Sequence, residues 1–348
     1  MLIAPKKIVA GEREKVSPIF QATMMIMSGL IIFMSFYYRI ELFRALDEPL
    51  VHETISPQKL RELGGYPEYV DVGLEIERFQ EFNVTKNQFT FTGNVWFEFE
   101  AGSVSIDTLK DFAFDRATIL YRSEPDTRLL GSKLMVRFLI KVAFNTGLVN
   151  SDFPVDDHRI NIVLSHPFVS PEEIIFEARA TNFVFDSNLL SSGWNTIDKS
   201  VKSGFTEARL SEQGTEKMVL QPMVAFSIDV ERYGARYVLA ILLPIFLMFF
   251  LIFYCLSVEA APSVAVSLGG ITGILAYRYV IEQLSPPTGD LMMSDHFFFL
   301  ILTSAMLVFL LNKLDLFVMQ LDMKKKVLGV VLIHMFTVIA SIYMLFPR

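Results

Sequence analysis

Two histidines lie close in sequence to a group of carboxylates, an arrangement that can bind and release protons near neutral pH. His158 and His166 are near Asp152, Asp156, Asp157, Glu172 and Glu173. Neighbouring negative charges favour the protonated form of histidine, so one interpretation is a pH sensor. The other interpretation is a solvated histidine beside a charged loop. The spacing of the two histidines does not suit a metal ion, although loose acidic clusters can hold Ca²⁺ weakly.

A second pair of charges, Arg278 and Glu282, lies within a largely apolar run. Residues four apart share one face of a helix, so these two side chains are able to form an ion pair. The structural interpretation is an ion pair in a crevice between helices. The functional interpretation is a charged ring around an aqueous path, because charges inside a membrane are costly and tend to line water.

Signatures of catalysis are absent from the chain. No Walker, Rossmann, GxSxG, HExxH or CxxC motif is present. The single cysteine, Cys255, lies in an apolar run, so the chain cannot form an intrachain disulfide. We therefore expect neither an enzyme, nor a bound cofactor or metal, nor a nucleic-acid partner.

The elements that must position these residues are apolar enough for a membrane, since the 348 residues are 52% hydrophobic and 20% charged. Crossing a bilayer takes about 20 helical residues. Five charge-free windows are long enough or nearly so, namely 16–38, 237–258, 260–277, 296–312 and 327–347. Residues 41–231 hold 30 acidic and 18 basic side chains, a net charge of −12. An acidic, water-exposed domain is therefore expected between membrane-bound ends.

Basic residues predict the orientation of these windows. Lys6, Lys7, Arg13 and Lys15 precede the first window and Lys324–Lys326 precede the fifth, which assigns both clusters and the N-terminus to the cytoplasm. The first window is either an uncleaved anchor or a removed signal. The anchor is favoured, because the run is long and Tyr37-Tyr38-Arg39 occupy the place of small cleavage-site residues. Having few small or polar residues, this helix is expected at the periphery of the bundle.

The segment between the membrane windows alternates apolar with other residues, which is typical of strands. The alternating stretches are 70–76, 89–99, 134–142, 160–164, 174–178 and 219–230. Short strands without long helices predict an antiparallel sandwich. Ser56-Pro57 and Gly64-Gly65 bound a short helix in the linker. The expected plan is tail and first helix at 1–40, linker at 41–65, sandwich at 66–232 and a four-helix domain at 233–348.

Several landmarks in this plan resemble one known family. An FPxD loop signature resembles the run Phe153-Pro154-Val155-Asp156. Trp194 resembles the tryptophan of a GEW turn, and Arg232 resembles an arginine that precedes the next membrane helix. Pro244 is similar to a proline in the next helix, and Glu282 with Pro286-Pro287 resembles the outer end of a pore helix. In this order they resemble a prokaryotic-type subunit of the pentameric ligand-gated ion channels, the Cys-loop receptor superfamily. The resemblance covers about residues 66–348, and the first membrane window has no counterpart in the family's four-helix plan.

The resemblance implies an immunoglobulin-like sandwich joined to a helical channel domain. It also implies a homopentameric ligand- or proton-gated channel in a bacterial inner membrane, with the sandwich in the periplasm. Phe153, Pro154, Asp156, Arg232, Pro286 and Pro287 would couple gating to the pore. The Asp156 carboxylate and the Arg232 guanidinium, both at the junction of the sandwich and the membrane, are expected to form a charge-assisted pair. The ligand is unknown, and protons and Ca²⁺ are candidate modulators. The alternative is a membrane-anchored periplasmic receptor that binds a ligand without conducting.

The family's ligand site lies between subunits and is lined by aromatic side chains. When the family's ligand-site positions are transferred to this sequence, the candidate ligand residues are Tyr121, His166 and Phe168. Pro167 occupies a position where the family often has an aromatic residue of a binding loop. Because the loop at 210–219 has no aromatic residue, a complete cage for an ammonium ligand is not expected. With 32 phenylalanines in the chain, Phe168 is expected in the core more than at a ligand.

The pore helix is expected over 262–284, where three glycines, each costing about 1 kcal/mol relative to alanine, favour close packing or water over lipid. Two registers are open. Aligning the outer end puts Ala265, Gly269, Thr272, Ala276, Tyr279 and Gln283 on the pore side. Aligning the inner end puts Ser263, Ser267, Gly270 and Ile274 there. The first is preferred, because the outer loop aligns without gaps.

Selectivity is expected to depend on Glu259 at the inner mouth and Glu282 at the outer end. A ring of carboxylates and an acidic outer domain concentrate cations. The motif Glu259-Ala260-Ala261-Pro262 resembles the one that precedes the pore helix in the family's anion channels, but the arginine that follows it there is absent. We favour cation selectivity and expect Glu259→Ala to shift reversal potentials toward anions.

Overall fold

The structure is a computed structural model that describes residues 16–47, 56, 66–84, 86–186, 190, 193–212, 215–232, 236–257, 260–287, 289–315 and 322–346. These residues form two compact units. The helical unit contains the helices at both ends of the chain and the segment Ser151–Val155. The strand unit consists of Phe43–Asn150 and Asp156–Tyr233, and it contains the strands.

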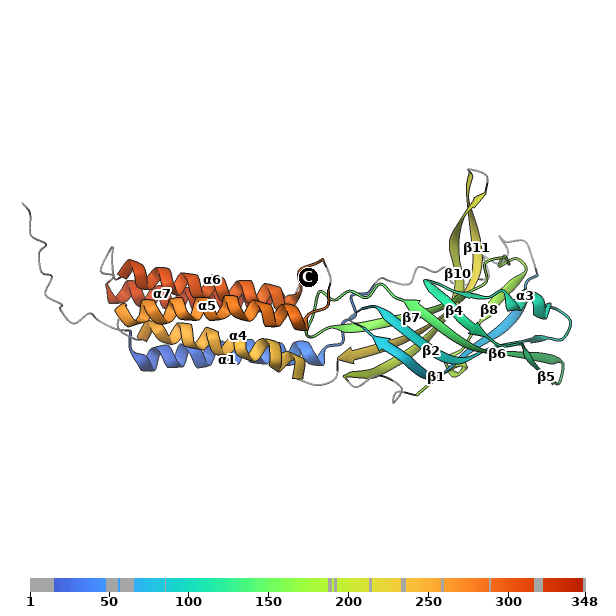
Figure 1. The fold of residues 1–348 in the computed structure, drawn as a ribbon, viewed down its shortest axis with the longest axis horizontal. Helices are drawn as coiled ribbons and strands as arrows, with labels where there is room; N and C mark the ends of the chain where they lie inside the picture. Colours follow the sequence, from blue (N-terminus) through green and yellow to red (C-terminus); the bar gives the residue numbers. More distant parts are fainter. Residues whose placement is uncertain are drawn as a thin grey trace, which may run out of the picture. The chain divides into compact units, whose positions relative to one another are not determined.

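The helical unit is built from five long helices, drawn in Figure 1 as blue and orange-to-red coils. They are α1 (Pro18–Glu41), α4 (Arg236–Tyr254), α5 (Ala260–Leu284), α6 (Met293–Leu314) and α7 (Met323–Leu345). Each is long and apolar enough to cross a membrane. The five expected windows are confirmed, and α5 continues past Arg278 and Glu282 as far as Leu284.

The strand unit contains two sheets. The first has the strand order β4-β6-β2-β1-β8, from β4 (Ala117–Arg122), β6 (Lys133–Asn145), β2 (Gln88–Glu100), β1 (Glu68–Asn83) and β8 (Ile174–Glu177). β5 (Asp126–Leu130) pairs with β6, and β9 (Phe183–Phe185) pairs with β1. The second sheet has the order β10-β11-β7-β3, from β10 (Trp194–Glu212), β11 (Thr215–Arg232), β7 (Asp157–Ser165) and β3 (Ala113–Phe114). The remaining short elements are α3 (Ile106–Lys110), η1 (Ala180–Asn182) and η3 (Cys255–Ser257).

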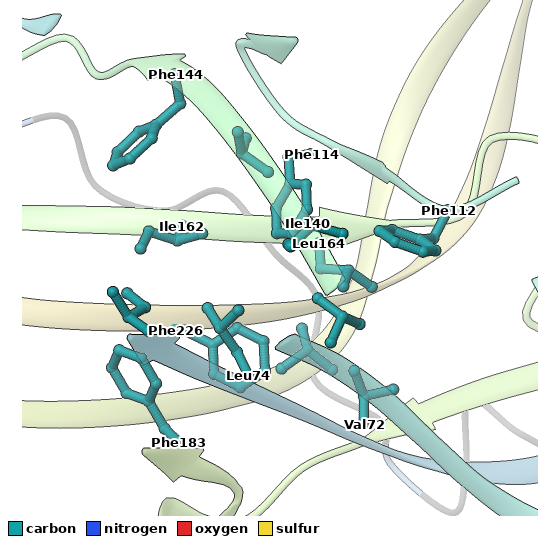
Figure 2. Packing of buried hydrophobic residues seen from close by; sticks show 14 of the residues in the cluster. Val72, Leu74, Phe112, Phe114, Ile140, Phe144, Ile162, Leu164, Phe183 and Phe226 are labelled. Atoms are coloured by element: carbon teal, nitrogen blue, oxygen red, sulfur yellow. The ribbon is translucent and has the colours of Figure 1, made fainter. Parts of the chain in front are cut away.

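Alternating side chains from the two sheets share one apolar core. Figure 2 shows Leu74 and Ile140 of the first sheet packed with Ile162 and Phe226 of the second. Since residues two apart on a strand point to the same face, one face of each sheet is buried and a sandwich-like arrangement results. All six expected strands are present.

The expectation of a purely antiparallel sandwich is wrong, because β8 and β9 pair with β1 in parallel. Both strands come after β7 in the sequence, and β7 belongs to the other sheet. The chain therefore crosses from the second sheet to the first before β8 and β9 pair with β1. A crossover of this kind delivers a strand in the parallel direction, which a tight hairpin cannot do. The expected linker helix after Ser56 lies outside the described residues.

Candidate functional site

Residues far apart in the sequence form a buried charge cluster in the strand unit, defined here as Asp47, Asp156, His158 and Arg232. The Arg232 guanidinium donates two hydrogen bonds to Asp156, from Nε at 2.8 Å and from Nη2 at 2.7 Å. His158 lies between two carboxylates, with Nε2 3.0 Å from Asp156 Oδ2 and Nδ1 3.2 Å from Asp47 Oδ1. Two acidic and two basic groups therefore neutralise one another away from water.

Strands position three of the four members. Asp156 directly precedes β7, His158 is the second residue of β7, and Arg232 ends β11. All of β7 pairs with the second half of β11, and Val230 lies opposite His158. Trp194, at the start of β10, is paired with Arg232, and the guanidinium lies 4.5 Å from the indole centroid. The ion pair expected between Asp156 and Arg232 is present. Two sequence landmarks, Asp156 and Arg232, thus belong to the cluster, and a third, Trp194, packs against it.

The cluster fixes the protonation of its members. Burial by itself lowers the pKa of His158, but its hydrogen bonds to Asp156 and Asp47 and their negative charges raise the pKa to about 9. Burial by itself raises the pKa of Asp156, but His158 and Arg232 bring that pKa well below its usual range. His158 is therefore an imidazolium at neutral pH. The interpretation of His158 as a solvated histidine is wrong, because its side chain is fully buried.

These pKa shifts predict how stability depends on pH. The raised pKa of His158 contributes stability that is present below about 6.5 and lost as the pH rises through about 9. The lowered pKa of Asp156 contributes stability that is present above 3.8 and lost only in stronger acid. We expect the melting temperature of the purified protein to fall from mildly acidic toward alkaline pH, and His158→Gln to flatten that alkaline fall.

His166 provides the matched control for this measurement. It is also buried, but its Nε2 lies 2.6 Å from the carbonyl oxygen of Thr108 and its Nδ1 accepts from the Phe168 amide. His166→Gln should leave the alkaline fall in place. An unchanged alkaline fall in His158→Gln would show that another group controls it.

The segment Ser151–Val155 packs in the helical unit, although strands flank it in sequence. The amides of Met293 and Ser294 donate to the carbonyl oxygens of Ser151 at 2.7 Å and Phe153 at 3.1 Å. These amides belong to the first turn of α6, where no intrahelical acceptor exists, so the loop caps the helix. Phe153 is buried among apolar residues of this unit and precedes Pro154 by a cis peptide bond. Phe153, one of the expected coupling residues, therefore contacts the helices of its own unit.

One stripe of α5 is left uncovered by the residues that the structure describes. It consists of the first-register residues Ala265, Gly269, Thr272, Ala276, Tyr279 and Gln283, all of which are exposed. Nothing lies within 4 Å of a Cβ built on Gly269. The stripe combines small and polar residues on a helix that is otherwise suited to a membrane, which is unusual for a lipid-facing surface.

The residues of the second register, by contrast, are buried within the helical unit. Ser263 donates to the carbonyl oxygen of Cys255 at 2.7 Å and accepts from Asn312 at 2.7 Å. Ser267 and Ile274 are buried. A Cβ on Gly270 would lie 2.7 Å from Ile252 Cγ1, so this glycine permits close packing of α5 on α4.

Arg278 pairs with a residue other than the one expected. Its Nη1 donates to Asp295 of α6, whereas Glu282 is exposed. Asp295 also accepts a hydrogen bond from the Met292 amide at 2.9 Å, at the N-terminus of α6. The expected Arg278–Glu282 pair is thus replaced by an ion pair between two helices. Of the two outer-loop prolines, Pro286 is buried and Pro287 is exposed. Glu259, the expected inner selectivity residue, lies outside the described residues.

A cavity of about 540 Å³ opens in the strand unit. Its lining combines polar and apolar surface and includes the charged residues Asp47, Asp115, Arg116, Arg159 and Glu207, together with Pro167 and Phe114. The predicted ligand residues Tyr121, His166 and Phe168 do not line it. Phe168 is 79% exposed, so its expected core position is wrong. The cavity suits a small polar or charged molecule better than an ammonium group held by aromatic rings.

Sequence reasoning missed Asp47, Arg39 and Asp295. Asp47 and Arg39 are more than a hundred residues from their partners, and no local spacing signals such a contact. Asp295 could have been found from its place directly before the predicted window 296–312, because carboxylates are favourable at the N-terminus of a helix. Among the described residues, no group of three or more His, Cys, Asp or Glu is arranged to hold a metal.

Comparison with protein-family models finds no match, and comparison with curated proteins finds no significant match either.

Proposed function

We propose that the chain is one subunit of a homopentameric ion channel of the pentameric ligand-gated family. In this proposal the two sheets form an immunoglobulin-like ligand-responsive domain in the periplasm, and α4–α7 form the channel domain in a bacterial inner membrane. The observation that carries the proposal is the uncovered α5 stripe. Five copies of a helix with small and polar residues on one face would enclose a water-filled path around a shared axis.

The coupling route in this proposal follows the chain. A ligand or proton acts by its differential affinity for the closed and open states. The residues that would carry the shift are Asp156 and Arg232 in the charge cluster, which are joined through the peptide chain to Phe153 and Pro154 in the loop that caps α6. Each contact on this route lies within one of the two units. The peptide bond between Val155 and Asp156 joins the units, because Val155 belongs to the helical unit and Asp156 to the strand unit.

Cation selectivity is the favoured form of the proposal. Glu282 is exposed one turn from Tyr279 on α5, so five copies would place five carboxylates near one end of the path. Glu259 would supply a second ring at the other end. The rival function is a non-conducting receptor, which the same strand unit and its polar cavity would also serve.

Two measurements on the purified full chain test the proposal together. Native mass spectrometry or imaging in nanodiscs should give a five-fold ring, and planar bilayers should show currents whose reversal potential follows the cation gradient. Recordings with pH and Ca²⁺ varied would identify either one as a modulator. A monomer or dimer without currents would refute the channel and favour the receptor.

A further inference from the structure

The N-terminal helix α1 docks on the bundle through a face that contains polar side chains. Gln21, Ser28 and Arg39 lie on this face with Ile32 and Phe36, and all five are buried. Gln21 Nε2 donates to the Phe253 carbonyl oxygen at 2.9 Å, and Ser28 Oγ is 2.8 Å from His334 Nδ1. A simple anchor needs only apolar side chains. Buried polar groups are costly unless paired, so these contacts specify one docked position of the helix.

Arg39 attaches the C-terminal end of α1 to the loop that caps α6. Its Nη2 donates to Asp152 Oδ2, and its Nη1 donates to the Leu42 carbonyl oxygen at 3.0 Å. Arg39 is only 1% exposed, and Asp152 is also buried. Because Asp152 lies between Ser151 and Phe153, whose carbonyl oxygens cap α6, the ion pair holds the middle of this loop.

The chain that leaves α1 next binds the two flanks of the same loop, within the strand unit. Asp47 Oδ1 accepts from the Val149 amide at 2.9 Å, and Asp47 Oδ2 accepts from the Arg159 amide at 2.6 Å. The Arg44 amide donates to Asp157 Oδ2 at 2.9 Å. Asp47 is also a carboxylate partner of His158 in the charge cluster. One short segment therefore contacts residues before, within and after the loop.

We propose that Arg39 and Asp47 are positioning residues of the loop Ser151–Val155 and its two flanks, so that α1 belongs to the gating machinery and is not only a membrane anchor. This inference rests on the proposed channel function. Any movement of the loop must either break the Arg39–Asp152 pair or carry the end of α1 with it. The docking of α1 then biases the closed–open equilibrium, which is an energetic coupling between the two processes.

The test compares Arg39→Gln, Arg39→Lys and Asp47→Asn in the full chain reconstituted in lipid. Thr23→Val is the matched control on α1, because Thr23 is exposed and its hydroxyl donates to the Ile19 carbonyl oxygen of its own helix. Hydrogen exchange is measured on peptides covering 149–159 and the first turn of α6. Basal potassium efflux from proteoliposomes is measured in parallel, without added ligand.

We expect Arg39→Gln and Asp47→Asn to speed exchange in those peptides while the β2–β6 core stays protected. Basal efflux should change by about fivefold or more, the range usual for coupled sites. Arg39→Lys should give exchange and efflux values between those of the wild type and Arg39→Gln. Adding Asp152→Asn to Arg39→Gln should change either readout little, because Arg39 and Asp152 share one interaction.

Exchange and efflux separate failure of the inference from failure of the channel proposal. If the wild type conducts no ions, the channel proposal fails and the gating role fails with it. Unchanged exchange in both Arg39→Gln and Asp47→Asn overturns the positioning role whether or not ions flow. Faster exchange with unchanged efflux in a conducting protein overturns the gating role. Additive effects of Arg39→Gln and Asp152→Asn would also contradict the proposed pair.

Discussion

Asp156→Ala is expected to destabilise the strand unit by about 3–5 kcal/mol, because it leaves Arg232 and His158 as buried charges without their shared carboxylate partner. Arg232→Ala should lower the stability by a similar amount, because the buried Asp156 carboxylate loses its guanidinium partner. Replacing both residues should cost less than the sum of the single changes, since one interaction is lost in each case. Under the proposed function, either single change also abolishes the response of the channel.

Thermal and denaturant unfolding, followed by tryptophan fluorescence, measure this effect, because Trp194 lies against Arg232. Asp126→Ala is the matched control. Asp126 pairs with Arg128, but both side chains are largely exposed, and such pairs contribute at most about 1 kcal/mol. Equal losses of stability in Asp156→Ala and Asp126→Ala would show that the charge cluster has no special structural role.

Gly269→Cys is expected to make ion flux sensitive to a charged thiol reagent. If the α5 stripe faces an aqueous path, five modified side chains would narrow it and place like charges inside it. Flux should then fall by about tenfold or more, equivalent to a rise in the barrier of about 1.4 kcal/mol. The measurement uses efflux or bilayer current before and after reagent, in a Cys255→Ala background that removes the native thiol.

Two neighbouring cysteines serve as controls for the register of α5. Ser267→Cys should be protected, because Ser267 is buried in the chain's own bundle. Leu268→Cys tests the adjacent face of the helix, since Leu268 is exposed but lies off the stripe. Block through Ser267→Cys together with protection of Gly269→Cys would contradict the proposed pore face.

The elements that could be predicted from sequence are those with a strong internal pattern. The membrane helices are long apolar runs, and β2 and β6 alternate regularly, so their side chains identify them without knowledge of neighbours. β10 was not predicted. Its residues Trp194–Glu212 are rich in polar side chains, because among the described strands it lies at the edge of its sheet, beside β11.

The candidate site divides in the same way. Asp156 and Arg232 could be anticipated as a pair from their landmarks, but Asp47 could not, because its partners come from a distant part of the chain. Local spacing was misleading for Arg278. Its neighbour Glu282 is one turn away on the same helix, yet Asp295 at the start of α6 provides a partner that only the packing of helices creates.

The balance of charges in the cluster determines which solution variable can disturb it. With His158 protonated, two carboxylates face two cations, so the group has no net charge and little field beyond its own volume. Dissolved ions screen charges that water can reach over about 8–10 Å, but they cannot enter a buried, neutral group. The cluster should accordingly respond weakly to ionic strength. Loss of one of the two ring protons of His158 would change the total charge of the cluster from zero to minus one while its members stay buried, so we expect the cluster to respond to pH much more than to ionic strength.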